Sequence, residues 1–140
     1  MELEASRTID RPVADVWRWY AVEHVRNHPR WDPDMHLEQI SDGPVGIGTR
    51  IRRRVTRSGE PVEGEMEVVE WEPERAFGVQ IHDENMEIRG RALFAETDPG
   101  RTLLKIVADF QGLDEAHAGF IQGMMERSVG NMKRLMESEL

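Results

Sequence analysis

The sequence contains no cysteine among its 140 residues. The chain therefore forms no disulfide, presents no thiolate nucleophile and holds no zinc site built on sulfur ligands. Long apolar runs are also missing, and the N-terminus, Met1-Glu2-Leu3-Glu4, has neither the basic nor the apolar segment of a signal peptide. We therefore expect a cytoplasmic protein without integral membrane association.

Basic residues are few relative to acidic ones. The 18 Lys and Arg residues against 27 Asp and Glu residues give a formal charge of −9. Such a charge repels phosphate backbones, so we expect no nucleic-acid partner. The common catalytic signatures are missing too: there is no Gly-x-Ser-x-Gly elbow, no phosphate-binding loop, no His-Glu-x-x-His and no dinucleotide fingerprint.

Two histidines have the spacing of metal ligands. His24 and His28 are four residues apart, and His36 is nearby, but Pro29 follows His28 directly and no carboxylate at ligand spacing completes a set. We predict no metal and no cofactor, and we interpret these histidines as exposed side chains beside a loop.

The length fits one domain spanning residues 1–140, and a composition of 39% hydrophobic and 32% charged residues is typical of a globular chain. Period-two alternation predicts strands near 2–10, 35–41, 49–57, 62–71, 76–83, 86–97 and 101–111. The breaks between the later strands are short and contain Gly, Pro, Asp or Asn, which favours antiparallel hairpins.

Two short helical segments follow the first strand. Helical spacing of Val13, Val16, Trp17 and Tyr20 predicts an amphipathic helix over 12–22, with Asp10 as its cap. A second short helix or turn over about 23–29 is expected to stop at Pro29. The following segment, 28–33, is predicted to be a rigid loop in which two prolines hold Trp31.

A long helix over about 114–138 closes the chain. One half of its helical wheel collects the apolar side chains, including four of the eight methionines, and its opposite face carries Gly119, Gly123 and Gly130. Only this helix is long enough to cover the sheet. The predicted fold is α+β, with a curved antiparallel sheet of six or seven strands wrapped around the C-terminal helix.

Four segments occur in a fixed order along the chain: 9–17 (IDRPVADVW), 28–33 (HPRWDP), 46–50 (GIGTR) and 70–77 (EWEPERAF). Together with the long terminal helix, they resemble the START-like (SRPBCC) superfamily, specifically its polyketide cyclase/dehydrase and lipid-transport group. The resemblance implies a helix-grip fold with a cavity between sheet and helix. It implies no fixed chemistry, since members include lipid carriers, ligand sensors and aromatic cyclases.

We expect the cavity to be lined by the methionine-rich helix face, by inward strand positions and by two aromatic residues near its mouth. Trp31 either gates that mouth or packs onto the body, and the apolar residues either line a cavity or fill the core. The predicted ligand-binding residues are Tyr20, Trp31, Ile51, Arg53, Met66, Phe77, Val79, Phe94, Ile106, His117, Phe120, Ile121, Met124 and Ser128.

Arg53 shares strand parity with Ile51 and Val55. If those side chains face the helix, a buried Arg53 needs a carboxylate partner, for which Glu65, Glu67 and Asp109 are available, or an anionic ligand group. The alternative is that Arg50, Arg52, Arg53 and Arg54 all form a solvated strand face paired with the acidic hairpin over 60–72.

The leading hypothesis is a carrier or sensor that binds a hydrophobic, lipid-like or aromatic small molecule. The rival is an aromatase/cyclase- or dehydratase-type enzyme in which His117 transfers protons and Arg53 holds an enolate or carboxylate. A third alternative is a protein-interaction module that uses the glycine face of the last helix. Monomer and homodimer both remain open.

Overall fold

The computed structural model describes residues 1–56, 59–84 and 86–140. Its elements are β1 (Glu2–Ile9), α1 (Val13–Trp17), a π-helical turn η1 (Arg18–Val22), α2 (His24–Trp31), β2 (Met35–Gln39), β3 (Arg50–Val55), β4 (Val62–Glu72), β5 (Ala76–Asp83), β6 (Met86–Asp98), β7 (Arg101–Phe110) and α3 (Glu115–Glu139). This confirms the predicted α+β class and the predicted order of strand, short helices, six strands and long helix.

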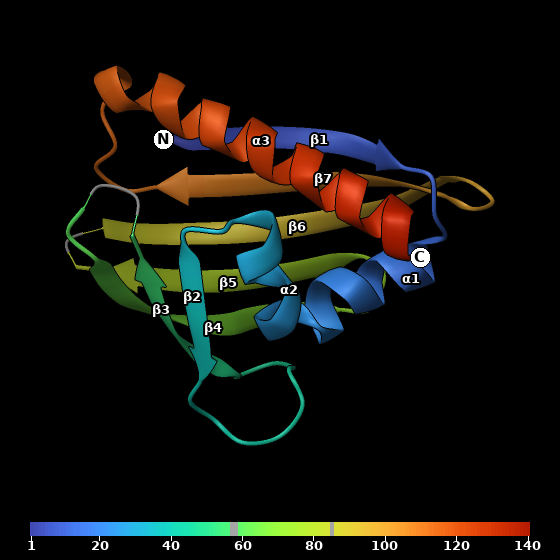
Figure 1. The fold of residues 1–140 in the computed structure, drawn as a ribbon, viewed down its shortest axis with the longest axis horizontal. Helices are drawn as coiled ribbons and strands as arrows, with labels where there is room; N and C mark the ends of the chain where they lie inside the picture. The colour runs from blue at the N-terminus through green and yellow to red at the C-terminus, as the bar shows by residue number, and fades with distance from the viewer. Residues whose placement is uncertain (57–58, 85) are drawn as a thin grey trace.

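The seven strands form one antiparallel sheet in the order β1-β7-β6-β5-β4-β3-β2. Successive strands from β2 to β7 are neighbours, and β1 closes the sheet by pairing with β7. Figure 1 shows α3 lying diagonally across one face of the curved sheet, with α1, α2 and β2 on the same side. The predicted helix-grip architecture is confirmed.

Side-chain alternation along β3 decides what faces the helix. Ile51, Arg53 and Val55 are buried, whereas the residues between them are exposed. On the exposed side Arg50 pairs with Glu65 and Arg52 with Glu38. The expected solvated strand face is therefore present for Arg50, Arg52 and Arg54, but of these two ion pairs only Arg50–Glu65 reaches the acidic hairpin over 60–72. Arg53 lies on the inner face and is 6% exposed.

An aromatic cluster fills the end of the sheet beneath α1. The ring of Trp17 meets Trp71 and Phe94 edge to face, with centroids 5.0 Å and 5.2 Å away. Trp17 is 6% exposed and Phe94 is equally buried. This cluster positions the N-terminal helices against β6, which fixes one end of the space under α3.

The first of the N-terminal helices differs from the prediction in two ways. The helix predicted over 12–22 is divided, because α1 passes into the π-helical turn η1 at Arg18. Asp10 does not cap it; Pro12 is the N-cap residue, and its carbonyl accepts from the amides of Asp15 and Val16. The π turn shifts the helical phase, so that Trp19 and Tyr20 are both buried.

Pro29 lies inside α2, which continues to Trp31 instead of ending at the proline. A proline inside a helix removes the amide that would bond four residues back, and its ring crowds the carbonyl there, so the helix needs other contacts to continue. Buried side chains hold the helix in place: Asn27 Nδ2 donates to the carbonyl of Trp19 at 2.7 Å, and Trp31 is 3% exposed. The predicted rigid loop over 28–33 is therefore wrong.

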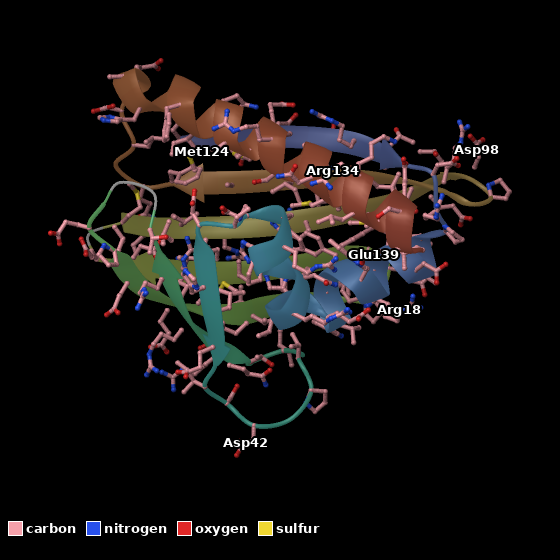
Figure 2. The ribbon with its side chains drawn as sticks, in the orientation of Figure 1. Arg18, Asp42, Asp98, Met124, Arg134 and Glu139 are labelled. Carbon is pink, nitrogen blue, oxygen red and sulfur yellow. The ribbon has the colours of Figure 1, made fainter. Side chains whose placement is uncertain are left out.

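The C-terminus of α3 is fastened to these helices by Glu139. Its carboxylate accepts from Trp19 Nε1 at 3.1 Å and forms an ion pair with Arg30. Figure 2 shows Glu139 at the end of α3 that approaches α1. This contact closes one end of the space between helix and sheet. Among the described residues, no helix is both long and apolar enough to cross a membrane.

Candidate functional site: a cavity between the sheet and the C-terminal helix

A cavity of about 660 Å³ lies between the inner face of the sheet and α3. Volumes of about 300–1,000 Å³ are usual for small-molecule sites. Phe120 lines the cavity from α3 and is nevertheless 62% exposed, so the cavity opens to solvent beside it. The space predicted between sheet and helix is therefore present.

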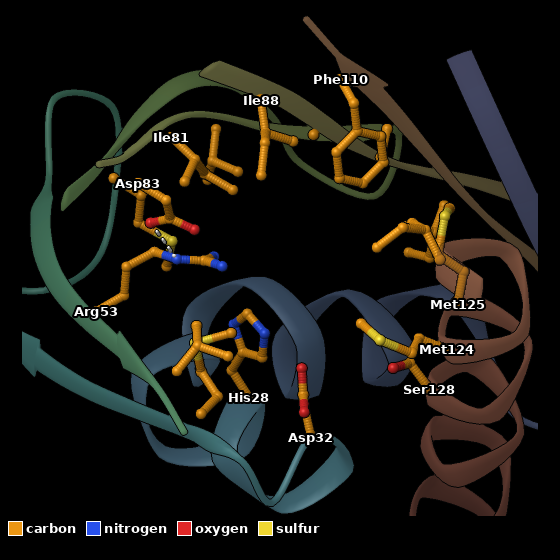
Figure 3. Close-up of a pocket in the computed structure, with 18 of the residues that line it drawn as sticks. His28, Asp32, Arg53, Ile81, Asp83, Ile88, Phe110, Met124, Met125 and Ser128 are labelled. Atoms are coloured by element: carbon orange, nitrogen blue, oxygen red, sulfur yellow. Dashed lines mark ion pairs between the residues drawn. The ribbon is translucent and has the colours of Figure 1, made fainter. Parts of the chain in front are cut away.

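Most of the cavity wall is apolar. The strands contribute Met66, Phe77, Val79, Ile81, Ile88, Ala92, Ile106, Ala108 and Phe110, and α3 contributes Phe120, Ile121, Met124, Met125, Val129 and Met132. Methionine side chains are flexible and polarisable, so this helical wall can adapt to irregular shapes. Figure 3 shows Met124 and Met125 facing Ile81 and Ile88 across the cavity.

Polar side chains gather at the end of the cavity formed by β3, β5 and α2. Arg53 and Asp83 form an ion pair there, with Arg53 Nε 3.0 Å from Asp83 Oδ1. The contact is an ion pair that lacks the alignment of a hydrogen bond. Both side chains are about nine-tenths buried. Figure 3 shows His28 and Asp32 pointing into the same space from the α2 side.

The Arg53–Asp83 pair spans β4, because Arg53 and Asp83 are both register partners of Gly64. Register partners in an antiparallel sheet point to the same face. Gly64 has no side chain on that face, so the guanidinium and the carboxylate meet over its Cα. None of the three partners suggested by the sequence, Glu65, Glu67 and Asp109, is the carboxylate that Arg53 contacts here; the partner in this ion pair is Asp83.

Two histidines of α2, His24 and His28, also line the cavity. His24 is 2% exposed, and its Nδ1 lies 3.0 Å from the carbonyl oxygen of Tyr20. Burial lowers the pKa of His24 to about 4; the contact with the Tyr20 carbonyl opposes the shift, and the charge of Arg53 adds to it. His24 is therefore neutral at physiological pH. His24 Nε2 lies 3.1 Å from His28 Nδ1.

Aromatic rings hold this histidine pair in place. Trp31 stacks between Tyr20 and His28, with ring centroids 4.9 Å and 4.8 Å away. Tyr20 is 7% exposed, and burial raises the pKa of its hydroxyl, which stays protonated. Of the two roles expected for Trp31, the structure places it in the packed arrangement, with one part of the indole on the cavity wall.

The structure brings most of the predicted ligand-binding residues to the cavity wall. These are Tyr20, Trp31, Arg53, Met66, Phe77, Val79, Ile106, Phe120, Ile121, Met124 and Ser128. Ile51 and Phe94 are buried but lie outside the cavity. For Phe94 the reason is visible, since Trp17 and Tyr20 cover its ring.

His117 does not face the cavity, and the predicted orientation is wrong. It lies in the first turn of α3, where its side chain is 70% exposed and its Nδ1 is 2.6 Å from Asp114 Oδ1. Asp114 is the N-cap residue and also accepts from the amide of His117. Capping holds this histidine at the helix terminus, away from the apolar wall.

Sequence reasoning missed His24, His28, Asp32 and Asp83 as cavity residues. A signal for the histidines was present: Tyr20, His24 and His28 recur every four residues, which is one helix face. The expected helix stop at Pro29 concealed it. Neither histidine is the exposed side chain that we expected, since His24 is buried and His28 is half-buried. Nothing in the local sequence singles out Asp83.

In the part of the chain that the structure describes, no three His, Asp or Glu side chains come together as metal ligands would. The polar end of the cavity offers the Arg53 guanidinium, the Asp32 and Asp83 carboxylates and the imidazoles of His24 and His28, and the Ser128 hydroxyl lies on the α3 side (Figure 3). Such a set can orient a polar group of a ligand and exchange a proton with it.

Comparison with known proteins agrees with this architecture. Among solved structures, Ara h 8.0201 superposes with a TM-score of 0.79 at 13% identity, covering 99% of each chain. Norcoclaurine synthase from Thalictrum flavum, in complex with a transition-state analogue, gives a TM-score of 0.74 at 14% identity, covering 99% of this chain and 94% of that one. At these identities the likeness concerns the fold alone.

A third solved structure, the di-domain ARO/CYC BexL from the BE-7585A biosynthetic pathway, gives a TM-score of 0.70 at 19% identity, covering 96% of this chain and 45% of that one. A search of curated proteins found no match. The model of the family described as polyketide cyclase/dehydrase and lipid transport matches residues 1–137. The chain therefore belongs to the polyketide cyclase/dehydrase and lipid-transport family, and its fold is that of the START-like helix-grip proteins.

Proposed function

We propose that this protein binds a hydrophobic small molecule with one polar group, as a carrier or sensor. The observation that carries the proposal is the division of the cavity into a long apolar wall and a single polar end. The apolar body of the ligand lies between the sheet and the methionines of α3. Its polar group, a carbonyl, phenol or carboxylate, lies at the end where Arg53, His28 and Asp32 converge.

The energetics of the polar end support a binding role. Burial of an ion pair such as Arg53–Asp83 costs desolvation energy, and apolar residues of similar size are often at least as stabilising. A purely structural core would therefore gain little from this arrangement. A polar group that fixes the orientation of a bound ligand is the usual use of such residues in an apolar pocket.

A second candidate is an aromatase/cyclase-type enzyme that uses the same cavity. It is favoured by the position of His28 opposite the Arg53 guanidinium (Figure 3), since a base beside a cation is what an enolising reaction requires. His117, the catalytic residue first considered, has no part in this candidate because it lies outside the cavity.

The first experiment is native mass spectrometry of the purified protein, followed by extraction of any bound molecule. Binding is then measured with two fluorescent probes, the anionic anilinonaphthalene sulfonate and the neutral phenylnaphthylamine. We expect both to bind, because each has an apolar aromatic body. If no molecule co-purifies and neither probe binds, the proposal is wrong.

A matched pair of variants locates the binding. Ser128→Trp fills the cavity from α3, whereas Ser138→Trp places the same side chain on the exposed surface of the same helix. We expect Ser128→Trp to weaken probe binding at least tenfold and Ser138→Trp to leave it unchanged. Equal effects of the two variants, at equal melting temperature, would place the probe outside the cavity.

A further inference from the structure

The antiparallel sheet ends in two edge strands, β1 and β2. The outward main-chain groups of an edge strand can pair with another strand unless something covers them. Three side chains cover the edge of β1 by donating to its outward carbonyl oxygens: Gln122 to that of Glu4, Arg7 to that of Ser6 and Lys133 to that of Thr8. The edge of β1 is therefore closed to a further strand.

The edge of β2 carries no such cover. Asp34 and Ile40, which flank β2, hydrogen-bond through their main chains to the chain at the two ends of β3. Hydrogen bonds alternate along an antiparallel pair, so the even-numbered residues of β2 bond to β3, and the N–H and C=O groups of Leu37 and Gln39 point away from it. In the described part of the chain, no side chain or loop hydrogen-bonds to the main chain of these two residues. Figure 1 shows the C-terminal end of β2 extending past α2.

The side chains of β2 are complementary to those of a second β2 strand. His36 and Glu38 are exposed on the outer face of the sheet, one on each side of Leu37. Antiparallel pairing of two copies about an axis at Leu37 would place His36 of each copy directly opposite Glu38 of the other. A shift of the axis by one residue would instead set two His36 or two Glu38 side chains against each other, and like charges directly opposite are destabilising. The side chains therefore select one register.

We propose that β2 is an interface between two copies of this chain, which pair antiparallel about Leu37. In this dimer the two Leu37 residues exchange both main-chain hydrogen bonds, and the Gln39 amide of each copy donates to the Met35 carbonyl of the other. The Met35 amide takes no part, because it already donates to the Asp32 carbonyl at 3.0 Å. The inference goes beyond the proposed function and does not depend on it, since the interface lies at the sheet edge.

Side-chain contacts on both faces of the sheet support the pairing. On the outer face, one carboxylate oxygen of Glu38 contacts Arg52 of its own chain, and the other oxygen is placed to accept from His36 of the second copy. On the inner face Leu37 is only partly buried, and it gains an apolar contact with its copy. Two strands of five residues form a small interface, so the dimer is weak and depends on protein concentration.

The first test is sedimentation velocity at protein concentrations up to about 1 mM, combined with amide hydrogen exchange followed by NMR. We expect the average mass to rise with concentration. Exchange of the Leu37 amide should slow at least tenfold between the lowest and the highest concentration. The Glu38 amide, which already bonds to β3, is the internal control and should exchange slowly throughout.

A charge exchange tests the contact between His36 and Glu38. His36→Glu places two carboxylates opposite each other on both sides of the axis, so it should weaken self-association about tenfold. The double variant His36→Glu/Glu38→Lys restores opposite charges and should restore self-association. Gln111→Glu adds the same charge at an exposed position after β7 and is the matched control, which should associate as the wild type does.

Cysteine variants test the register. The chain has no cysteine, so only introduced thiols can form a disulfide. In the proposed pair, residue 36 of one copy faces residue 38 of the other, with Cβ atoms about 4.5–5.5 Å apart. Under mild oxidation, a mixture of His36→Cys and Glu38→Cys proteins should therefore cross-link at least tenfold faster than either variant alone.

The outcomes decide the proposal independently of ligand binding. A chain that stays monomeric up to about 1 mM overturns it, and the edge of β2 is then left to an extended segment of a different partner. Equal weakening by His36→Glu and Gln111→Glu also overturns it, as does cross-linking that is no faster in the mixture. Self-association with slowed Leu37 exchange, restored in the double variant, supports it. Failure of this interface would leave the binding of both fluorescent probes unchanged.

Discussion

Arg53 of β3 and Asp83 of β5 form an ion pair across β4, and the residue directly between them in the sheet is Gly64. A Cβ atom at position 64 would lie 1.9 Å from Asp83 Oδ1 and 2.4 Å from the backbone oxygen of His82. The polar end of the cavity therefore depends on a residue that has no side chain. Gly64 acts by leaving space, which no inspection of polar residues alone would reveal.

Gly64→Ala should destabilise the protein by about 2–4 kcal/mol, because the new methyl group displaces a buried carboxylate and also meets backbone. Urea denaturation measures the change. Gly119→Ala is the control: a Cβ at this exposed position of α3 meets nothing, so alanine should stabilise the helix by up to about 1 kcal/mol. A Gly64→Ala protein as stable as the wild type would show that the pair can rearrange at little cost.

The stability of the protein should fall between pH 7.5 and pH 4 because of His24. Its pKa is about 4 in the folded protein against 6.5 for an unperturbed histidine. Between these values the unfolded chain binds more protons, so protonation favours unfolding as the pH falls. The loss expected from this one group is about 3 kcal/mol, complete near pH 4. Denaturation midpoints measured across this range test it.

His24→Phe removes the titrating group and keeps an aromatic ring, so its stability should vary less with pH over the same range. His82→Phe is the control, since His82 lies on the exposed face of the sheet, and it should retain the wild-type pH dependence. An unchanged slope for His24→Phe would mean that other groups cause the acid sensitivity.

The fold could be predicted from sequence because alternation and helical spacing are local signals. The inward position of Arg53 was one of two alternatives that the sequence left open, and it is the one that its parity with Ile51 and Val55 suggested. Its partner could not be predicted, because Asp83 approaches it only through the register of three strands and the missing side chain of Gly64. His28 was missed for a different reason: Pro29 was expected to end α2, and burial within the helix outweighs the local preference of proline.

Glu139 should stabilise the attachment of α3 to the N-terminal helices. The hydrogen bonds from Arg30 and Trp19 lower the pKa of its carboxyl to about 2. Its contribution is present above about pH 4.5 and is lost as the pH falls toward 2. Because the pair is partly exposed, Glu139→Gln should cost only about 1 kcal/mol at neutral pH.

Glu139→Leu should cost more than Glu139→Gln. Glutamine can still accept the hydrogen bond from Trp19 Nε1, whereas leucine cannot. Because Trp19 is only 2% exposed, the loss of this acceptor for its indole N–H is costly. Glu115→Gln, in the first turn of the same helix, is the charge-matched control. Thermal and urea denaturation of the three variants measure the order. Equal stability of Glu139→Gln and Glu139→Leu would show that the hydrogen bond from Trp19 Nε1 does not contribute to the stability of this attachment.

Replacement of the buried ion pair should separate stability from function. In the double variant Arg53→Met/Asp83→Leu, apolar side chains of similar size take the place of two desolvated charges, so the free energy of unfolding should stay equal or rise by about 1–3 kcal/mol. Asp83→Leu alone should lose about 3–5 kcal/mol, because Arg53 then lacks the buried carboxylate that it contacts. The double variant should still bind neutral phenylnaphthylamine and should bind anionic anilinonaphthalene sulfonate at least tenfold more weakly. If the double variant binds both probes as the wild type does, the ion pair has a structural role, and the polar group of the ligand must be recognised elsewhere in the cavity.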